Sequence, residues 1–385
     1  MTGGAAGPEY GRYESMPSTP RRLPRFGGGL PAALVLALAL SAPGGPLAAD
    51  GPVTVRDDNG NVVTLAKPAE RVAALPPPLG TFAVSIAGGP RRIVAVHPWS
   101  KEAMLQGTLA RYFPDLRDMP TGAVGQGHMP NIEELIRLRP DLVFQLGMAG
   151  NAAVESIRAA GLPVLAINVS GNKDVNWIEM LGKGLGAEPR AGAILAWRTQ
   201  VQHMIEERLR DLPAAHRPSV VHISRFRPML SVVAGGHFRN WQIELAGGVN
   251  PAAEIPQISA VIEPEMLLVW NPDVILLNAF ETGLRPDDLY RDARFSTLSA
   301  VVNRRVYAWP IGGDRWEAPT QESPLGWMWL SALLHPARFD WAMDVEMAKA
   351  HTLLYGHSPT PEEMRATLRL HDNAGSAGYE RFDIR

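Results

Sequence analysis

The sequence of 385 residues contains no cysteine. Disulfide bonds, thiolate metal sites, cysteine nucleophiles and a lipid-modified cysteine anchor are therefore excluded. Charge of one sign is not in excess either, because 37 Lys and Arg residues stand against 39 Asp and Glu residues and leave a net charge of −2. The composition therefore gives no sign of the basic surface that nucleic-acid binding requires.

The sequence motifs of the common enzyme classes are also missing. No Gly-x-Ser-x-Gly, Gly-x-x-x-x-Gly-Lys or His-Glu-x-x-His motif occurs. The glycine-rich stretch 122–127 does not join a strand to a helix in the dinucleotide-binding pattern, and we interpret it as a loop. We expect a binding protein and no enzyme. A secreted hydrolase that uses scattered acids, or a structural envelope protein, is the alternative.

One N-terminal stretch has the composition of a secretory signal. Three arginines within residues 21–25 precede the apolar run 30–40, and small residues follow as far as Ala49. The apolar run is short for a transmembrane helix. We therefore predict cleavage near Ala49 and a mature protein in the periplasm, with an uncleaved anchor as the alternative. The export route, general or twin-arginine, is left open.

A repeated pattern organises the rest of the chain. Residues 131–144 and 263–276 each place a Glu, Glu133 or Glu265, before a short apolar helix. In both copies Pro-Asp follows seven residues after this Glu, and a run of aliphatic residues comes next. Proline ends the helix and favours an extended chain, so each copy predicts a helix followed by a buried strand. Two such units so far apart indicate two similar lobes.

The remaining patterns predict an α/β fold with two lobes, each a mostly parallel sheet flanked by helices. Residues 53–65 resemble a hairpin around Asn59-Gly60. Residues 174–212 contain no strand pattern and include a long stretch of helical periodicity, which places the lobe junction there. The predicted organisation is a signal peptide and disordered N-terminus at 1–49, an N-terminal lobe at 50–172, a helical linker at 173–216, a C-terminal lobe with terminal helices at 217–371, and a loose tail at 372–385.

Seven segments in order are similar to the helical-backbone (class III) periplasmic substrate-binding proteins of ABC importers, the ferric-siderophore, haem and cobalamin type. They are 53–65, 69–74, 131–144, 244–250, 265–277, 295–310 and 355–363. The resemblance covers roughly residues 51 to 365. It implies two α/β lobes bridged by one long rigid helix, a ligand cleft between them and a small hinge motion. It further implies an ABC permease as partner, and we expect a monomer.

The resemblance assigns Glu133 and Glu265 to permease docking, because a Glu at this place in each lobe contacts arginines of the permease in that family. One carboxylate in each lobe would fix the orientation of the complex as well as its affinity. The alternative is that each Glu only complements the dipole of the helix it precedes.

The cleft should lie where loops leave the carboxyl ends of the strands. Aromatic side chains offer area and arginines offer bidentate contacts, a combination that suits a large ligand with anionic oxygens. The alternative is that the tryptophans pack against loops and the arginines pair with nearby acids. The predicted ligand-binding residues are His97, Trp99, Met148, Arg225, Arg227, His237, Arg239, Asp314, Arg315 and Trp316, with Glu317 next to them.

A free-metal site would need His and carboxylate ligands from both lobes. His97, His128, His237 and Glu317 could supply one, but no closely spaced His pair is present, and we expect neither a bound metal nor a cofactor. The predicted cargo is a ferric siderophore or a similar iron complex. Cobalamin, haem with His97 or His237 as axial ligand, molybdate and a nickel chelate are the alternatives.

Overall fold

The computed structural model describes residues 51–77, 79–147, 151–168 and 174–384. The predicted signal peptide at 1–49 and the predicted ligand contact Met148 lie outside these ranges. Within the described residues, no helix combines the length and the apolar character needed to cross a membrane.

The N-terminal lobe is built on a parallel four-stranded sheet in the order β4-β3-β5-β6. Both faces of the sheet are covered: Val72 and Ala74 belong to the core with α1 and α6, and Ala73 between them belongs to the core with α4 and α5. Its elements are β1 Val53–Arg56, β2 Val62–Leu65, β3 Val72–Ala74, α1 Leu79–Ala87, β4 Ile93–Val96, α2 Pro98–Gln106, α3 Leu109–Tyr112, α4 Ile132–Leu138, β5 Leu142–Leu146, α5 Ala152–Ala159, β6 Val164–Ile167 and α6 Asp174–Leu185.

The C-terminal lobe has a five-stranded sheet in the order β11-β10-β7-β8-β9. Strands β7, β10 and β11 are parallel, and β8 and β9 add an antiparallel edge. Its elements are β7 Val220–Arg225, β8 Ser231–Val233, α8 Phe238–Leu245, β9 Ser259–Val261, α9 Pro264–Trp270, β10 Val274–Leu277, α10 Pro286–Tyr290, α11 Ser299–Val302, β11 Val306–Ala308, α12 Ser323–Leu334, α13 Met343–Tyr355 and α14 Pro361–Thr367. The two lobes and their mostly parallel sheets confirm the predicted fold class.

The repeated sequence pattern forms the same structure in both lobes. Helices α4 and α9 each end at a residue with left-handed backbone, Arg139 (φ 46°) and Asn271 (φ 40°), before Pro-Asp. The aspartate then binds the start of the neighbouring strand. Oδ2 of Asp141 accepts hydrogen bonds from the backbone of Glu70 (2.8 Å) and Arg71 (3.0 Å). Oδ2 of Asp273 accepts one from the backbone of Ser219 (2.8 Å).

Helix α7, Glu188–Leu209, joins the lobes as the sequence predicts. Its 22 residues correspond to about 33 Å of helix. The N-terminal half buries Ile194 in the core of the first lobe, and the C-terminal half buries Val201 and Ile205 in a core of the second.

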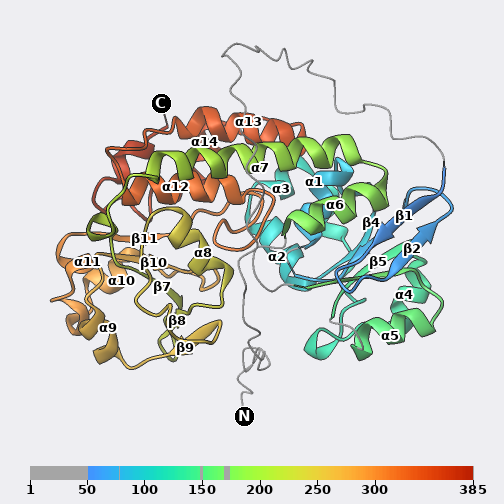
Figure 1. Ribbon diagram of the computed structural model, residues 1–385, viewed down its shortest axis with the longest axis horizontal. Coiled ribbons are helices and arrows are strands. Elements are labelled where there is room, and N and C mark those ends of the chain that lie inside the picture. Colours follow the sequence, from blue (N-terminus) through green and yellow to red (C-terminus); the bar gives the residue numbers. More distant parts are fainter. Residues whose placement is uncertain (1–50, 78, 148–150, 169–173, 385) are drawn as a thin grey trace. The chain divides into compact units, whose positions relative to one another are not determined.

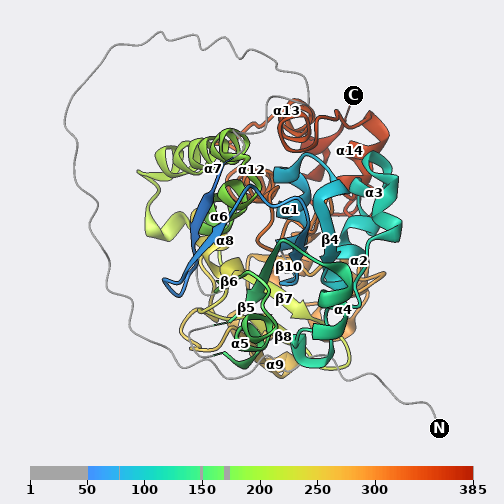
Figure 2. The same cartoon turned by 90° about the vertical axis from the view of Figure 1, so that its right-hand side faces the viewer.

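The expectation of one bridging helix is incomplete, because α13 also spans both lobes. Met347 and Ala350 lie in the C-terminal core, whereas Leu354 and Tyr355 lie in the N-terminal core. The carbonyl of Leu354 accepts hydrogen bonds from the Ser85 hydroxyl (3.1 Å) and from Nη2 of Arg190 (2.9 Å). Helices α7 and α13 run along the same side of the lobes in both views (Figures 1 and 2).

The C-terminal tail differs from the loose segment that the sequence predicts. Tyr379, Phe382 and Ile384 are buried in the core of the C-terminal lobe. The Asn373 side chain accepts a hydrogen bond from the backbone of Ala308 in β11 (2.8 Å). These three apolar residues are enough to anchor the otherwise polar tail, because each of their side chains is more than nine-tenths buried.

Candidate functional site

The loop after β11 carries several predicted ligand contacts and touches the N-terminal lobe. Nη2 of Arg315 donates to Oε1 of Gln106 at 2.9 Å and to Oε1 of Glu102 at 3.3 Å, both on α2. The Thr81 hydroxyl of α1 donates to Oδ2 of Asp314 at 3.0 Å. This loop therefore brings a guanidinium group of the C-terminal lobe to the boundary between the lobes.

A second arginine and an aromatic ring complete this cluster. The guanidinium carbons of Arg239 and Arg315 lie 5.3 Å and 4.5 Å from the centre of the Phe280 ring. Phe280 is 46% exposed, and its backbone N–H donates to Oδ1 of Asn278 (2.9 Å), which fixes the turn after β10. Two cations thus flank an accessible aromatic ring, an arrangement in which the ring quadrupole favours positive charge at its faces.

Glu317 provides the buried negative charge behind Arg239. Oε2 of Glu317 lies 2.8 Å from Nε2 of His222 and 3.5 Å from Nε of Arg239. Burial by itself would raise the pKa of Glu317, but the charge of Arg239 and the contact with His222 lower it below its ordinary value. Burial lowers the pKa of His222. Glu317 is therefore ionised at neutral pH, and its charge is balanced mainly by Arg239.

The N-terminal lobe contributes an aromatic group at the start of α2. His97 is buried, His128 and Trp99 are half-buried, and the three ring centres lie 5.0 to 5.4 Å apart. Nε2 of His97 and Nδ1 of His128 are 3.0 Å apart. Trp99 shares one face of α2 with Glu102 and Gln106, because these residues follow it by three and seven positions. That face is the one that contacts Arg315, about 5 to 10 Å along the helix from Trp99.

The other predicted contacts of the C-terminal lobe have different surroundings. His237 is half-buried and precedes α8, and its Nδ1 accepts the backbone N–H of Arg239 at 3.0 Å. Arg225 is exposed at the end of β7. Arg227 is exposed and pairs with Asp288 at 3.4 Å. This pairing agrees with the alternative prediction, in which the arginines pair with nearby acids.

Trp316 and Asp314 turn inward in this conformation, and Arg315 between them is also buried, with 3% of its surface exposed. Trp316 is fully buried, and its Nε1 donates to Oε2 of Glu322 at 2.6 Å. Asp314 is also buried, and this burial raises its pKa to about 6. The sequence places both beside Arg315 but does not show that their side chains turn inward, because the tight turn that pairs Ile311 with Arg315 is not visible in the sequence.

Sequence reasoning missed Phe280, Glu102 and Gln106, and considered His128 only as a metal ligand. Phe280 follows β10 by three residues, so the rule that ligands meet the carboxyl ends of strands would have found it. Glu102 and Gln106 lie inside a helix and give no such signal, because their role depends on a contact with the other lobe.

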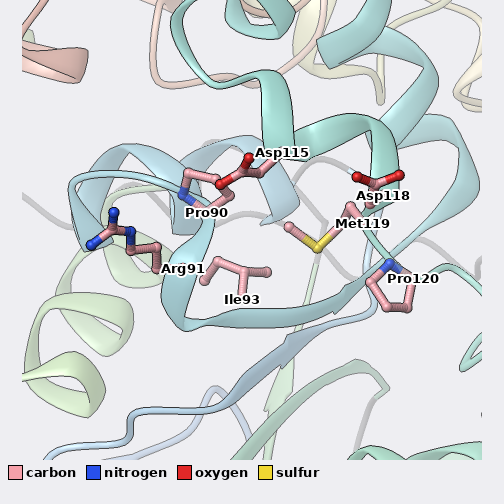
Figure 3. A pocket seen from close by; sticks show the side chains of 7 residues that line it. All are labelled: Pro90, Arg91, Ile93, Asp115, Asp118, Met119 and Pro120. Atoms are coloured by element: carbon pink, nitrogen blue, oxygen red, sulfur yellow. The ribbon is translucent and has the colours of Figure 1, made fainter.

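Two pockets lie away from these residues. One is a pocket of about 140 Å³ beside the start of β4, lined by Pro90, Arg91, Ile93, Asp115, Asp118, Met119 and Pro120 (Figure 3). The other, about 830 Å³, is formed by residues near the C-terminus, among them Trp341, Arg365 and Phe382. The first is smaller than typical ligand sites. Neither contains a predicted ligand-binding residue, so we do not assign the cargo to them.

In the described part of the chain, no group of three or more His, Asp or Glu side chains is arranged to hold a metal ion. His97 and His128 meet each other, but Glu317 instead meets His222 and Arg239. The four residues named as possible metal ligands are thus divided between two clusters.

Comparisons with known proteins agree with this architecture. A family model described as periplasmic binding protein matches residues 82–311. The molybdate-binding protein MolA of Haemophilus influenzae is 25% identical over 338 residues, which cover 82% of this chain and 93% of MolA. The iron-uptake system-binding protein of Bacillus subtilis is 24% identical over 241 residues, 58% of this chain and 73% of that protein. A periplasmic solute binding protein from Veillonella parvula superposes with a TM-score of 0.78 at 26% identity, covering 84% of this chain and 99% of that structure.

Proposed function

Because this chain belongs to the periplasmic binding protein family, we propose that it is the substrate-binding component of an ABC importer for a small oxyanion of the molybdate type. One observation carries the choice of cargo: Arg239 and Arg315 converge on the exposed ring of Phe280 at the boundary between the lobes. The family works outside the cytoplasm, and the predicted signal peptide is the proposed route of export.

The hydrogen-bond donors of the site suit an anion. Glu317 and Arg239 balance each other's charge, so Arg239 contributes guanidinium donors and no net positive charge. Arg315 pairs with Glu102, but the Glu102 side chain is 54% exposed, so solvent weakens the attraction between the two charges. A guanidinium group binds an oxyanion through two parallel hydrogen bonds. The relative MolA is named for molybdate binding, which is consistent with this class of cargo.

An anionic metal chelate, including the ferric siderophore predicted from the sequence, is the second candidate. The half-buried Trp99 and the exposed Phe280 offer aromatic area that a bare oxyanion does not need. The relative from Bacillus subtilis is named for iron uptake. Neither candidate requires the protein to make or break a bond.

Titration of the purified protein tests the proposal. Molybdate, tungstate, sulfate, ferric chelates, haem and cobalamin would be compared by isothermal calorimetry and by tryptophan fluorescence. We expect molybdate to bind the wild-type protein and to bind an Arg239→Gln, Arg315→Gln variant at least 10-fold more weakly. Arg291→Gln is the matched control, because Arg291 is exposed and pairs with Asp287. Unchanged affinity in the double variant, or binding of cobalamin alone, would contradict the proposal.

We also propose that Glu133 and Glu265 dock onto the permease. Both are exposed in the first turns of equivalent helices, α4 and α9, one in each lobe. Both helices lie at the lower side of Figure 1, opposite α7 and α13. Reversing both charges to Arg should abolish uptake by cells and leave cargo affinity intact. Glu206→Arg, on the exposed face of α7, is the control. Loss of cargo binding in the double variant would refute a docking role.

A further inference from the structure

Two histidines begin helices at corresponding places in the two lobes. His97 follows β4 and begins α2, where its Nδ1 accepts the backbone N–H of Trp99 at 3.1 Å. His237 follows β8 and begins α8, where its Nδ1 accepts the backbone N–H of Arg239 at 3.0 Å. Each histidine therefore satisfies one of the free N–H groups at a helix start, a role that Ser, Asp or Asn usually fills.

This capping bond determines which ring nitrogen carries the proton. A backbone N–H can be accepted only by an unprotonated nitrogen, so Nδ1 is bare and a neutral ring carries its proton on Nε2. Burial lowers the pKa of both histidines, that of His97 to about 4. Both rings are therefore neutral at pH 7, and Nε2 of each is a hydrogen-bond donor.

In the N-terminal lobe this donor has an acceptor. Nε2 of His97 lies 3.0 Å from Nδ1 of His128, which must be bare to accept its proton. The Gln145 side chain donates to the carbonyl of His128 at 3.1 Å and holds that residue in place. The capping arrangement is complete there and needs no ligand.

In the C-terminal lobe the same donor has no acceptor. Nε2 of His237 lies 3.2 Å from Nη1 of Arg239, and a guanidinium nitrogen can only donate. The other tautomer would not remove the conflict, because Nδ1–H would then face the backbone N–H of Arg239. Nε of Arg239 faces Oε2 of Glu317 at 3.5 Å and takes no part in this conflict. Two donors, Nε2 of His237 and Nη1 of Arg239, thus meet where an acceptor is missing, whereas buried polar groups in proteins are normally paired.

We propose that an oxygen atom of the anionic cargo lies within hydrogen-bond distance of both Nε2 of His237 and Nη1 of Arg239 and accepts a hydrogen bond from each. This inference rests on the proposed function and identifies His237 as a specificity-determining residue. A site made of donors alone suits an oxyanion without a proton, such as molybdate or sulfate. Hydrogen phosphate would also need an acceptor for its own proton, and Glu317 already accepts from the Ala279 backbone (2.7 Å) and contacts His222.

The test separates the capping role of His237 from its donor role. In His237→Asn the amide oxygen can still cap α8, because Asn is a favourable capping residue, but the Nε2–H donor is lost. We expect this variant to keep the wild-type melting temperature and to bind molybdate about 10- to 100-fold more weakly. His203→Asn is the control, because His203 is exposed on α7, and it should retain molybdate affinity to within about threefold.

Long-range ¹H–¹⁵N spectra of the histidine side chains provide a second measurement, independent of any ligand. They should show a bare Nδ1 and a protonated Nε2 for His237. A protonated Nδ1 at His237, or full molybdate affinity in His237→Asn, would overturn the inference. If the wild-type protein binds no member of the ligand panel, the proposed function fails, whereas the spectra still decide the tautomer.

Discussion

A single methyl group added at Gly107 should separate the lobes. Gly107 ends α2, and a Cβ atom there would lie 1.7 Å from the backbone carbonyl oxygen of Gly312 in the other lobe. Its φ of −100° is accessible to alanine, so the variant tests this contact and not the backbone conformation. The added Cβ atom would be fixed to one backbone and would meet the backbone carbonyl of Gly312, so no flexible side chain can move to make room.

The cost of this change can be estimated from the structure. Restoring a separation of 3.0 Å moves the two backbones apart by about 1.3 Å. Overpacking of this kind costs about 1–3 kcal/mol. The hydrogen bond from the backbone N–H of Thr108 to the same carbonyl, now 3.1 Å, would be lost for about 1 kcal/mol more. Gly107→Ala should therefore lower the free energy of unfolding by about 2–4 kcal/mol, or the Tm by roughly 3–6 °C.

Urea unfolding and calorimetry would measure the change, with Gly192→Ala as control. Gly192 is exposed on α7 and a Cβ there meets nothing within 4 Å, so alanine should stabilise the helix by about 0.5–1 kcal/mol. A loss of stability in Gly107→Ala together with a gain in Gly192→Ala would support the reasoning. If Gly107→Ala were as stable as the wild type, the lobes would not meet at Gly312 in solution, and the placement of Arg315 against α2 would have to be abandoned.

Three further predictions concern charge and packing. Burial raises the pKa of Asp314 from 3.8 to about 6, so the wild-type protein loses stability as this group ionises. Between a pH below 4 and a pH above 6, Asp314→Asn should therefore gain about 3 kcal/mol of stability relative to the wild type. Urea unfolding across that pH range would measure the difference. Glu102→Gln should raise molybdate affinity about two- to fivefold at low salt, because it removes the acid that competes for Arg315; a fall in affinity would show that Glu102 itself binds the cargo. Phe382→Ala should cost about 3–5 kcal/mol by calorimetry, whereas a loosely attached tail would show almost no change.

The sequence predicted the parts of the fold that depend on local patterns. The hairpin, the helix and Pro-Asp strand of each lobe, and the long helix α7 are all visible as periodicity, turn residues and proline positions. The second bridging helix was not predicted. Its apolar residues show that α13 is buried, but periodicity does not show that Leu354 and Tyr355 are buried against the other lobe.

The structure places the residues of the predicted site in different surroundings. Arg239 and Arg315 were named because they follow strands, and the structure brings both to Phe280. Trp316 was named for the same reason but points into the core. Position relative to a strand predicts which loop faces the ligand, whereas the direction of each side chain depends on contacts distant in sequence. The donor conflict at His237 has no sequence signal, because it arises from hydrogen-bond geometry.

The contribution of α13 to both cores has a consequence for biogenesis. The hydrophobic interior of the first lobe includes Leu354 and Tyr355, which belong to the last tenth of the chain. If the proposed signal peptide exports the chain unfolded and N-terminus first, nearly the whole polypeptide must cross the membrane before this first lobe can close. The N-terminal lobe would then complete its core only when the C-terminal residues arrive.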